Sequence, residues 1–264
     1  MSEAPTKQEL PELPLLQSPR AKVHYISDLK QLEDAVRDLT SSKGAVAIDA
    51  ERASGFKYSQ RAYLVQLRAI NTDIFLIDPV SVPGILETKP YRELSQALKD
   101  REWILHAATQ DLACLDEIGL KPGAIFDTEL AARLAGQPRV GLGALTENLL
   151  SYRLAKEHSA ADWSTRPLPE SWLNYAALDV DVLHELAEAV GSLLQEQGKT
   201  SWADEEFRSL LSFKPRPQRP DRWRAITGLH KVADRQSLEM ARRLWLAREE
   251  RAQKMDVSPG SLIP

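Results

Sequence analysis

The stretch "AVAIDAERASG", residues 45–55, ends an apolar run with two acids, Asp49 and Glu51. Uninterrupted runs of Ala, Val and Ile are typical of strands that are buried on both faces. Side chains two positions apart on a strand point to the same side, so both carboxylates should project together from one face of the sheet. Like charges this close raise each other's pKa and cost stability unless a cation lies between them. The stretch therefore indicates a central strand that ends in a metal site.

The spacing of these two acids is a weak signal on its own, because it recurs in the chain, for example at Asp127/Glu129 and Asp204/Glu206. Only the first pair terminates a long apolar run, and this position favours it as the functional pair. A chance arrangement stays open as the alternative at this point.

Apolar runs on either side of this strand predict further strands. Asn71 and Thr72 separate two of them and signal a hairpin, so the strand of Asp49 and the next two strands should form an antiparallel meander. The last two strands follow helical segments and should lie parallel to one another. The predicted strands are 22–26, 44–52, 61–70, 73–79, 103–107 and 124–127.

Helices are predicted where apolar residues recur at spacings of three and four. They are expected at 28–39, 90–100, 110–118, 127–135, 141–150 and 169–197. The result is a mixed sheet with helices on both faces. A meander followed by alternating helices and strands is the order expected of a ribonuclease-H-like α/β fold.

Composition places the chain among globular proteins. Its 264 residues are 43% hydrophobic, enough for one domain of ordinary size and a smaller unit. No apolar run approaches the ~18 residues of a membrane span. Residues 1–20 carry acids and prolines where a signal peptide needs a basic start, and we expect a flexible tail there. Cys114, the only cysteine, excludes an internal disulfide, suits a reducing cytoplasm and is expected in the core.

The charge is unevenly distributed along the chain. Residues 1–206 hold 32 acidic residues against 21 basic ones, whereas residues 207–254 hold 13 basic residues against 5 acidic ones. A basic segment fits nucleic-acid phosphates, and an acidic body can act on a polyanion if its carboxylates hold divalent cations. A solvated charged helix remains the alternative for the basic segment taken alone.

The basic segment begins with a linker and ends in a helix. Proline and arginine alternate in "KPRPQRPDR", residues 214–222, which is typical of a linker. Residues 237–255 predict a basic amphipathic helix, and a single helix cannot bury its apolar stripe without a partner. The end of the chain therefore looks like a domain cut short. The expected organisation is a tail at 1–20, a main domain at 21–205, a basic linker at 206–235 and a partial small domain at 236–264.

Two later segments carry further candidates. In "LHAATQDLACL", Asp111 opens a helix after a strand, where an acid also suits the helix dipole, and His106 taken alone is more often structural. In "NYAALDVDVLHEL", Tyr175 and Asp179 are four apart and share a helix face. Tyr175 could equally be a core residue with its hydroxyl at the surface. Asp181 points elsewhere and is expected to be solvated.

Together, these motifs resemble the DEDD exonucleases of the subgroup with tyrosine. The segments "YLVQL", "FDTELAARLAG" and "KEHSAADWSTRPLPESWLNYAALDVDVL" sharpen the resemblance to ribonuclease D, which covers roughly residues 22–200. The stretch "SLEMARRLWLAREERAQKMDVSPGSLIP", residues 237–264, resembles the opening helix and loop of an HRDC domain, the small nucleic-acid-binding module of that family.

The resemblance implies two divalent cations, Mg²⁺ or Mn²⁺, since oxygen ligands suit these ions. Asp49 would bridge them, and Glu51 and Asp179 would lie on the ion that activates water. Asp111 would support the other ion, and Tyr175 would orient the attacking water. The side chains expected to contact the substrate are His106, Gln110, Trp163 and Arg166.

The implied reaction is hydrolysis of the 3′-terminal phosphodiester of RNA, including tRNA precursors, with release of nucleoside 5′-monophosphates. Trp163 could instead be a core residue and Arg166 a structural ion-pair partner. A DNA-directed 3′-5′ exonuclease on the same fold and an inactive nucleic-acid-binding adaptor stay open as alternatives. The presence of all four acids and the tyrosine favours an active enzyme. A monomer without membrane contact is expected.

Overall fold

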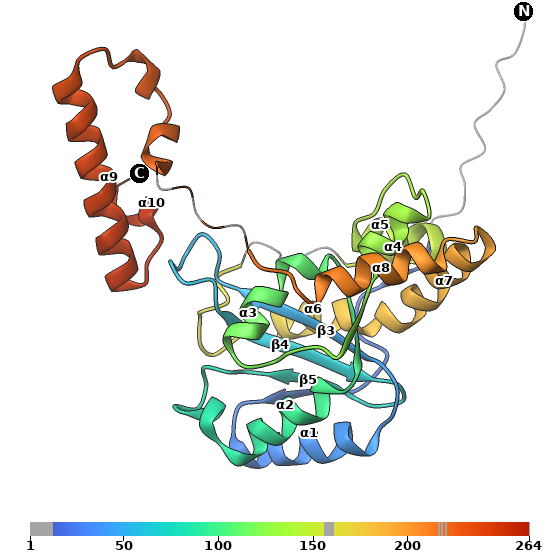
Figure 1. The fold of residues 1–264 in the computed structure, drawn as a ribbon. Helices are drawn as coiled ribbons and strands as arrows, with labels where there is room; N and C mark the ends of the chain where they lie inside the picture. Colours follow the sequence, from blue (N-terminus) through green and yellow to red (C-terminus); the bar gives the residue numbers. More distant parts are fainter. Residues whose placement is uncertain (1–12, 156–160, 216, 218, 220, 264) are drawn as a thin grey trace, which may run out of the picture.

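The main domain is built on a mixed sheet, and the acids of the first motif lie on its strand β3, Val46–Arg52 (Figure 1). The computed structural model describes residues 13–155, 161–215, 217, 219 and 221–263. Among them the strand order of the main sheet is β2-β5-β4-β3-β6-β7. The strands are β2 (Val23–Ile26), β3 (Val46–Arg52), β4 (Ala62–Ala69), β5 (Ile74–Ile77), β6 (Glu102–Leu105) and β7 (Ala124–Asp127).

The predicted meander is confirmed. β3 pairs with β4 and β4 with β5, both antiparallel. The turn between β4 and β5 contains Asn71 with a φ of 60°, a left-handed conformation that asparagine tolerates. β6 and β7 then add to the other side of β3 in parallel, each after a helical crossover. β3 therefore lies inside the sheet: β6 pairs with its first residues, Val46 and Ala47, and β4 pairs along its whole length.

Helices cover both faces of this sheet (Figure 1). Val46 and Ile48 of β3 face one hydrophobic cluster together with α1, α2 and α3. Ala47, which points the other way, belongs to a second cluster under α6. The helices of this domain are α1 (Leu29–Ser41), α2 (Lys89–Lys99), α3 (Leu112–Glu117), α4 (Thr128–Leu134), α5 (Leu142–Leu145), α6 (Glu170–Asp181), α7 (Leu183–Glu196) and α8 (Thr200–Leu210).

Three predicted helices are broken. The helix predicted at 169–197 divides at Val182 into α6 and α7, because α6 packs in the cluster under the sheet while most of the apolar side of α7 faces the other cluster. The helix predicted at 110–118 starts as a 3₁₀ turn, η2 (Ala108–Gln110). The helix predicted at 141–150 continues from α5 as a π-helical turn, η3 (Thr146–Leu150).

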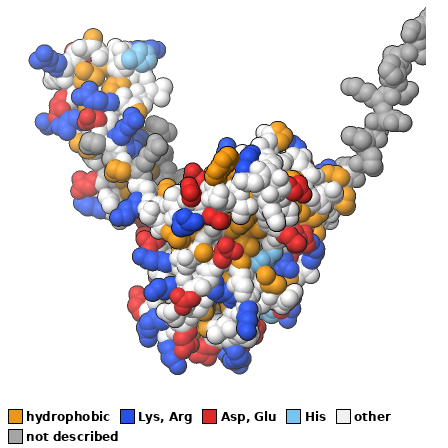
Figure 2. Space-filling view, turned by 45° about the vertical axis from the view of Figure 1, so that its right-hand side comes forward, with side chains coloured by type: hydrophobic (Ala, Val, Ile, Leu, Met, Phe, Trp, Pro, Cys, Tyr) orange, Lys and Arg blue, Asp and Glu red, His pale blue; other side chains and the backbone are white. Residues whose placement is uncertain are grey.

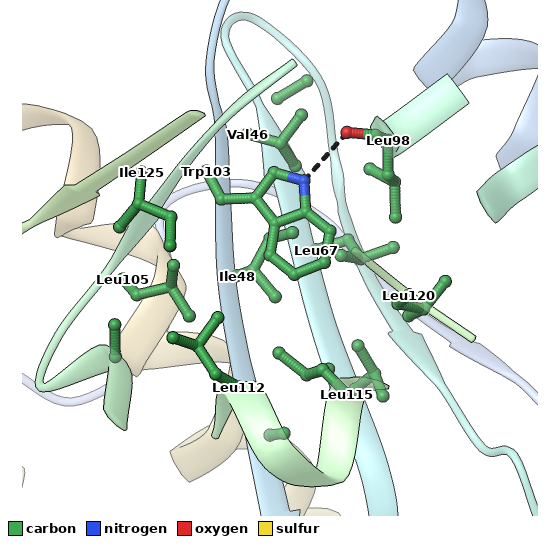
Figure 3. Packing of buried hydrophobic residues seen from close by; sticks show 14 of the residues in the cluster. Val46, Ile48, Leu67, Leu98, Trp103, Leu105, Leu112, Leu115, Leu120 and Ile125 are labelled. Carbon is green, nitrogen blue, oxygen red and sulfur yellow. Dashed lines mark hydrogen bonds between the residues drawn. The ribbon is translucent and has the colours of Figure 1, made fainter. Parts of the chain in front are cut away.

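Trp103 is the centre of the larger core cluster (Figure 3). It is fully buried, and its indole N–H donates to the Leu98 carbonyl at 2.9 Å. Around it pack Ile48 of β3 and Leu115 of α3. Truncating such a tryptophan to alanine costs about 3–5 kcal/mol. This packing fixes β3, β6 and α3 against one another, and these elements carry or adjoin three of the candidate acids, Asp49, Glu51 and Asp111.

The predicted flexible tail needs correction in its last part. Residues 13–20 contain β1 (Leu15–Leu16), which pairs in parallel with β8 (Arg153–Leu154). Arg20 also holds the buried carboxylate of Asp181 at 2.9 Å. These contacts fix the segment on the main domain, while the rest of the predicted tail lies outside the described residues.

The basic linker predicted from residue 206 begins later in the structure. α8 extends through residue 210, because Phe207 and Leu210 are buried in the main core. Beyond it, residues 221–263 form what we call the C-terminal unit, in which α9 (Arg235–Met255) confirms the predicted amphipathic helix. Two other elements of the unit, η4 (Arg222–Ala225) and α10 (Pro259–Leu262), pack against α9.

The C-terminal unit carries many lysine and arginine side chains, which gather at the upper left of Figure 2. It touches the main domain at the loop that follows β3. There the backbone N–H of Ser59 donates to the Asp256 carboxylate at 2.8 Å, and the N–H of Ser258 donates to the Phe56 carbonyl at 2.9 Å. Within the described parts of the chain, no helix combines the length and apolar character that a membrane crossing requires.

Candidate active site

Three carboxylates from two elements meet in a cavity beside the sheet. Asp49 and Glu51 lie near the end of β3, and Asp179 comes from α6, which crosses that face of the sheet. One carboxylate oxygen of each residue lies within 4.8 Å of those of the other two. The sequence spacing of the first two acids therefore does bring them to one side of the strand.

Asp111 reaches the same cavity from the neighbouring strand. β6 runs parallel to β3, and after it the chain turns at Ala107, which has a left-handed φ of 58°. Asp111 follows at the start of α3 and is only 5% exposed. Its carboxyl group shares a hydrogen bond with that of Asp49. The four acids named by the sequence motifs thus line one cavity.

A fifth acid, Asp127, holds the turn that delivers Asp111. Its buried carboxylate accepts hydrogen bonds from the N–H groups of Ala107 at 3.1 Å and Ala108 at 2.9 Å. The same carboxylate accepts from Glu129 at 2.9 Å and Leu130 at 3.2 Å, at the start of α4. With its oxygens used in this way, Asp127 is a structural residue, although its sequence spacing to Glu129 copies that of the metal-site pair.

Burial raises the pKa of all four clustered carboxyl groups, and their mutual repulsion adds to the effect. For Glu51 the charges of Asp49 and Asp179 follow burial as causes. For Asp111 and Asp179 the charge of Asp49 follows burial. For Asp49 itself the hydrogen bond from Asp111 opposes the rise. Four anions this close are unfavourable without cations, and divalent cations would relieve the repulsion.

The donor set fits Mg²⁺ or Mn²⁺. The titratable ligand groups in the cavity are carboxylates and one imidazole, and hard oxygen donors suit both ions. Cys114 is not a donor here, because its thiol donates to the Asp111 carbonyl at 3.1 Å. Burial raises the pKa of that thiol to about 12, so it stays protonated. The prediction that Cys114 is a core residue is confirmed.

Tyr175 lies one helical turn before Asp179 and lines the same cavity. Burial, together with the charges of Asp179 and Glu51, raises the pKa of its hydroxyl above the ordinary value. The hydroxyl is therefore protonated at neutral pH. It can donate one hydrogen bond and accept another, but it is a poor general base.

His106 and Gln110 also line the cavity, as predicted for substrate contacts. Nδ1 of His106 lies 2.9 Å from the hydroxyl of Thr128, which donates its proton to the Leu105 carbonyl at 3.1 Å. Because that hydroxyl has one proton, Nδ1 must donate, which leaves Nε2 as an acceptor. Burial lowers the pKa of His106, so the ring is neutral at pH 7.

Trp163 and Arg166, the other two predicted substrate contacts, do not line this cavity. Trp163 is 1% exposed and packs edge-on against Trp172. Arg166 holds the buried Asp78 carboxylate with two hydrogen bonds, at 2.6 and 2.8 Å, and also donates to the Tyr63 carbonyl at 2.8 Å. These contacts favour the structural alternatives, a core tryptophan and an ion-pair arginine.

The prediction that Asp181 is solvated is wrong. Asp181 is 1% exposed, and its carboxylate receives Arg68 of β4 at 2.5 Å and Arg20 at 2.9 Å. Both arginines are more than 100 positions away in the sequence, so local spacing could not reveal them. Asp204, by contrast, is exposed on α8, away from this cavity.

The cavity has a volume of about 350 Å³, and sequence motifs did not single out all of its lining. Of its apolar residues, Leu142 and Leu183 begin α5 and α7, and Ala161 lies in the loop before Trp163; no chemical signal marks them. Two polar residues directly after Glu51 were also missed, although their closeness to the D-x-E pair was a signal. The lining residues missed are Arg52, Ser54, Leu142, Ala161 and Leu183. Residues 156–160, part of the "KEHSA" motif, lie outside the described residues.

Solved structures and curated proteins similar to this chain agree on one fold. A protein from Bifidobacterium adolescentis is 43% identical with a TM-score of 0.89, over 96% of this chain and 61% of that one. Escherichia coli RNase D, described as an exoribonuclease involved in structured RNA processing, is 26% identical with a TM-score of 0.68, over 92% of this chain and 64% of that one. The predicted ribonuclease-H-like fold is confirmed by these likenesses.

Among curated proteins, ribonuclease D of Psychromonas ingrahamii is 30% identical over 222 residues, which are 83% of this chain and 58% of that protein. The chain thus spans little more than half the length of such relatives. The model of a family described as 3′-5′ exonuclease matches residues 23–195, which include all four acids and Tyr175. The chain belongs to this 3′-5′ exonuclease family, and the resemblance to ribonuclease D that its motifs indicated is confirmed.

Proposed function

We propose that this protein is a 3′-5′ exoribonuclease that hydrolyses the terminal phosphodiester of RNA and releases nucleoside 5′-monophosphates. The observation that carries the proposal is the meeting of four carboxylates and a tyrosine in one cavity. Membership of the 3′-5′ exonuclease family and the likeness to ribonuclease D support it. The residues assigned to catalysis are Asp49, Glu51, Asp111, Tyr175 and Asp179.

The four carboxylates would hold two divalent cations, Mg²⁺ or Mn²⁺. When bound, these would stabilise the attacking and the leaving oxygen at phosphorus. The chain's own contribution is rigidity: β3 carries two ligands, α6 a third, and the turn held by Asp127 presents Asp111. Tyr175, kept protonated, would orient the attacking water through its hydroxyl.

Two further side chains would position the end of the substrate. Nε2 of His106 can accept a hydrogen bond from a ribose hydroxyl, since Nδ1 is engaged by Thr128. Gln110 is exposed at the cavity and can donate to a phosphate or sugar oxygen. Because these contacts are to the sugar and phosphate groups of the RNA and not to its bases, base specificity should be slight. We propose RNA 3′ ends, including tRNA precursors, as the substrate class, because the curated relatives are ribonucleases D.

The chain would divide into a catalytic domain and a basic C-terminal unit. Residues 21–205, continued by the end of α8, would form the catalytic domain. The C-terminal unit would be the opening part of an HRDC domain and would add basic RNA-binding surface (Figure 2). A monomer in a reducing cytoplasm is consistent with a single, buried cysteine.

The test is degradation of 5′-labelled single-stranded RNA and DNA of one sequence by the full chain, with Mg²⁺, with Mn²⁺ or with chelator. The proposal predicts metal-dependent shortening of RNA from the 3′ end, release of nucleoside 5′-monophosphates, and slower loss of DNA. Faster loss of DNA would favour the DNA-directed exonuclease. Tight RNA binding without cleavage under any metal would favour the inactive adaptor.

A further inference from the structure

Arg52 is the one lysine or arginine among the described residues that line the cavity of the four acids. It directly follows Glu51 as the last residue of β3. In a regular strand, neighbouring side chains point to opposite faces. Here the pairing of β3 with β4 shifts between Glu51 and Arg52, which face Leu64 and Ala62. The extra residue is Tyr63 of β4, and bulges of this kind are common beside active sites.

The charge of Arg52 acts on the acid cluster. Burial raises the pKa of Asp49, Glu51 and Asp111, and the positive charge of Arg52 opposes that rise at each of them. Arg52 thus lines the same cavity as these acids and is within electrostatic reach of three of them.

The guanidinium of Arg52 also has N–H donors available for a ligand. In the described parts of the chain, no hydrogen bond or ion pair engages it, whereas Arg166 is held by Asp78 and Arg68 by Asp181. Arginine offers five N–H donors in a planar fork that suits the oxygens of a phosphate. Arg68 and Arg166 are each tied to a buried aspartate, and Arg52 is not.

The formal charges of the occupied site indicate a role for Arg52. Two divalent cations would balance four carboxylates, so a bound phosphodiester would add one uncompensated negative charge. We infer that Arg52 is a phosphate-binding residue of this site, which contacts a non-bridging oxygen of the last or the last-but-one phosphodiester of the substrate. The inference rests on the proposed function for its substrate class and extends it to a residue outside the acid and tyrosine motifs.

The experiment measures RNA affinity by fluorescence anisotropy, in Ca²⁺ or Mg²⁺ at one salt concentration, with the intact length of the RNA checked after each titration. The full chain is compared as wild type, Arg52→Met and Arg52→Lys. Four RNA oligomers are used: one unmodified, and three with a single uncharged methylphosphonate at the last, the last-but-one or the fourth linkage from the 3′ end. Arg37→Met, an identical charge change on the exposed face of α1, is the control.

Loss of a charge-assisted hydrogen bond should weaken binding of unmodified RNA by about tenfold or more in Arg52→Met. Arg52→Lys should recover part of that loss, and Arg37→Met should show almost none. The loss should disappear with the methylphosphonate at the last or the last-but-one linkage and persist with the one at the fourth. Thermal unfolding of each variant separates a folding defect from this pattern.

The opposite pattern would overturn the inference: an equal loss with all four RNAs, or no loss beyond that of Arg37→Met. Wild-type degradation of the unmodified RNA in Mg²⁺ is measured alongside. If wild type degrades RNA but the loss of affinity in Arg52→Met does not depend on the position of the methylphosphonate, only the role of Arg52 is wrong. If wild type degrades nothing, the proposed function fails, whatever the binding data show for Arg52.

Discussion

Asp49 in β3 and Asp111 at the start of α3, just after the neighbouring parallel strand β6, are 62 positions apart in the chain and share a hydrogen bond between their carboxyl groups. A proton held between the two carboxyl groups would relieve part of the repulsion among the four acids in the metal-free protein. Divalent cations would compete with that proton for the same oxygens. The contact explains why acids can be buried at the end of a core strand, and it makes the stability of the metal-free protein depend on pH.

The first prediction concerns that pH dependence. A raised carboxyl pKa means that the folded protein binds a proton more tightly than the unfolded chain does. The stability this provides is fully present below the ordinary carboxyl pKa and is lost as pH rises through the raised values. In chelator, the unfolding free energy of wild type should therefore fall relative to that of Asp49→Asn as pH rises above the ordinary carboxyl range. Urea unfolding at a series of pH values measures this fall, and Mn²⁺ should restore the unfolding free energy of wild type. Parallel pH curves for the two proteins would contradict the clustered acids.

The second prediction concerns Tyr175. Tyr175→Phe removes one hydroxyl that can orient water and leaves the carboxylates in place. Single-turnover cleavage should slow about tenfold to a hundredfold, the value of one strong hydrogen bond in the transition state. Mn²⁺ affinity measured by calorimetry should be unchanged. An unchanged cleavage rate would remove the tyrosine from the mechanism.

The third prediction concerns Asp127. Four backbone N–H groups donate to the Asp127 carboxylate. Asp127→Asn keeps the shape of the side chain but removes its charge and replaces one of the two acceptor oxygens with an NH₂ group. Unfolding free energy should fall by about 3 kcal/mol, and activity should fall too because the turn that presents Asp111 loosens. The control is Glu129→Gln, whose ion pair with the exposed Arg133 contributes less than about 1 kcal/mol. Equal stabilities for the two variants would show that the four hydrogen bonds do not hold the turn.

The fourth prediction separates the two roles considered for Arg166. Arg166→Met leaves the fully buried Asp78 with Tyr25 as its remaining side-chain donor. Breaking a buried pair on one side costs about 3–5 kcal/mol. Chemical denaturation should show this loss, while RNA affinity well below the melting temperature should stay near that of wild type. A large loss of RNA affinity with unchanged stability would restore Arg166 as a substrate contact.

Local sequence patterns were sufficient for much of the site. The period of two in a strand brought Asp49 and Glu51 to one side, and the period of four in a helix placed Tyr175 and Asp179 on one cavity. The antiparallel meander followed from the turn at Asn71, and the parallel strands from the helices between them. These features depend on neighbours within one element, which a sequence displays directly.

Features that depend on distant partners were not predictable in this way. Asp181 looked solvated because the arginines that bury it come from β4 and from the segment before β2. Nothing local marks the bulge beside Arg52, since it arises in the pairing with β4. The division of the predicted helix at Val182 depends on two core clusters that meet only in the folded chain.

The central claim is that Asp49 and its three neighbours hold the cations of a 3′-5′ exonuclease. Its most direct test compares metal-dependent shortening of 5′-labelled RNA by wild type, Asp49→Asn and Asp204→Asn. Asp204 begins a D-x-E pair of the same spacing but is exposed on α8, so it is the matched control. The account predicts a 3′-to-5′ ladder with wild type and Asp204→Asn in Mg²⁺ or Mn²⁺, none in chelator, and none with a folded Asp49→Asn. A ladder of wild-type rate from Asp49→Asn would contradict it.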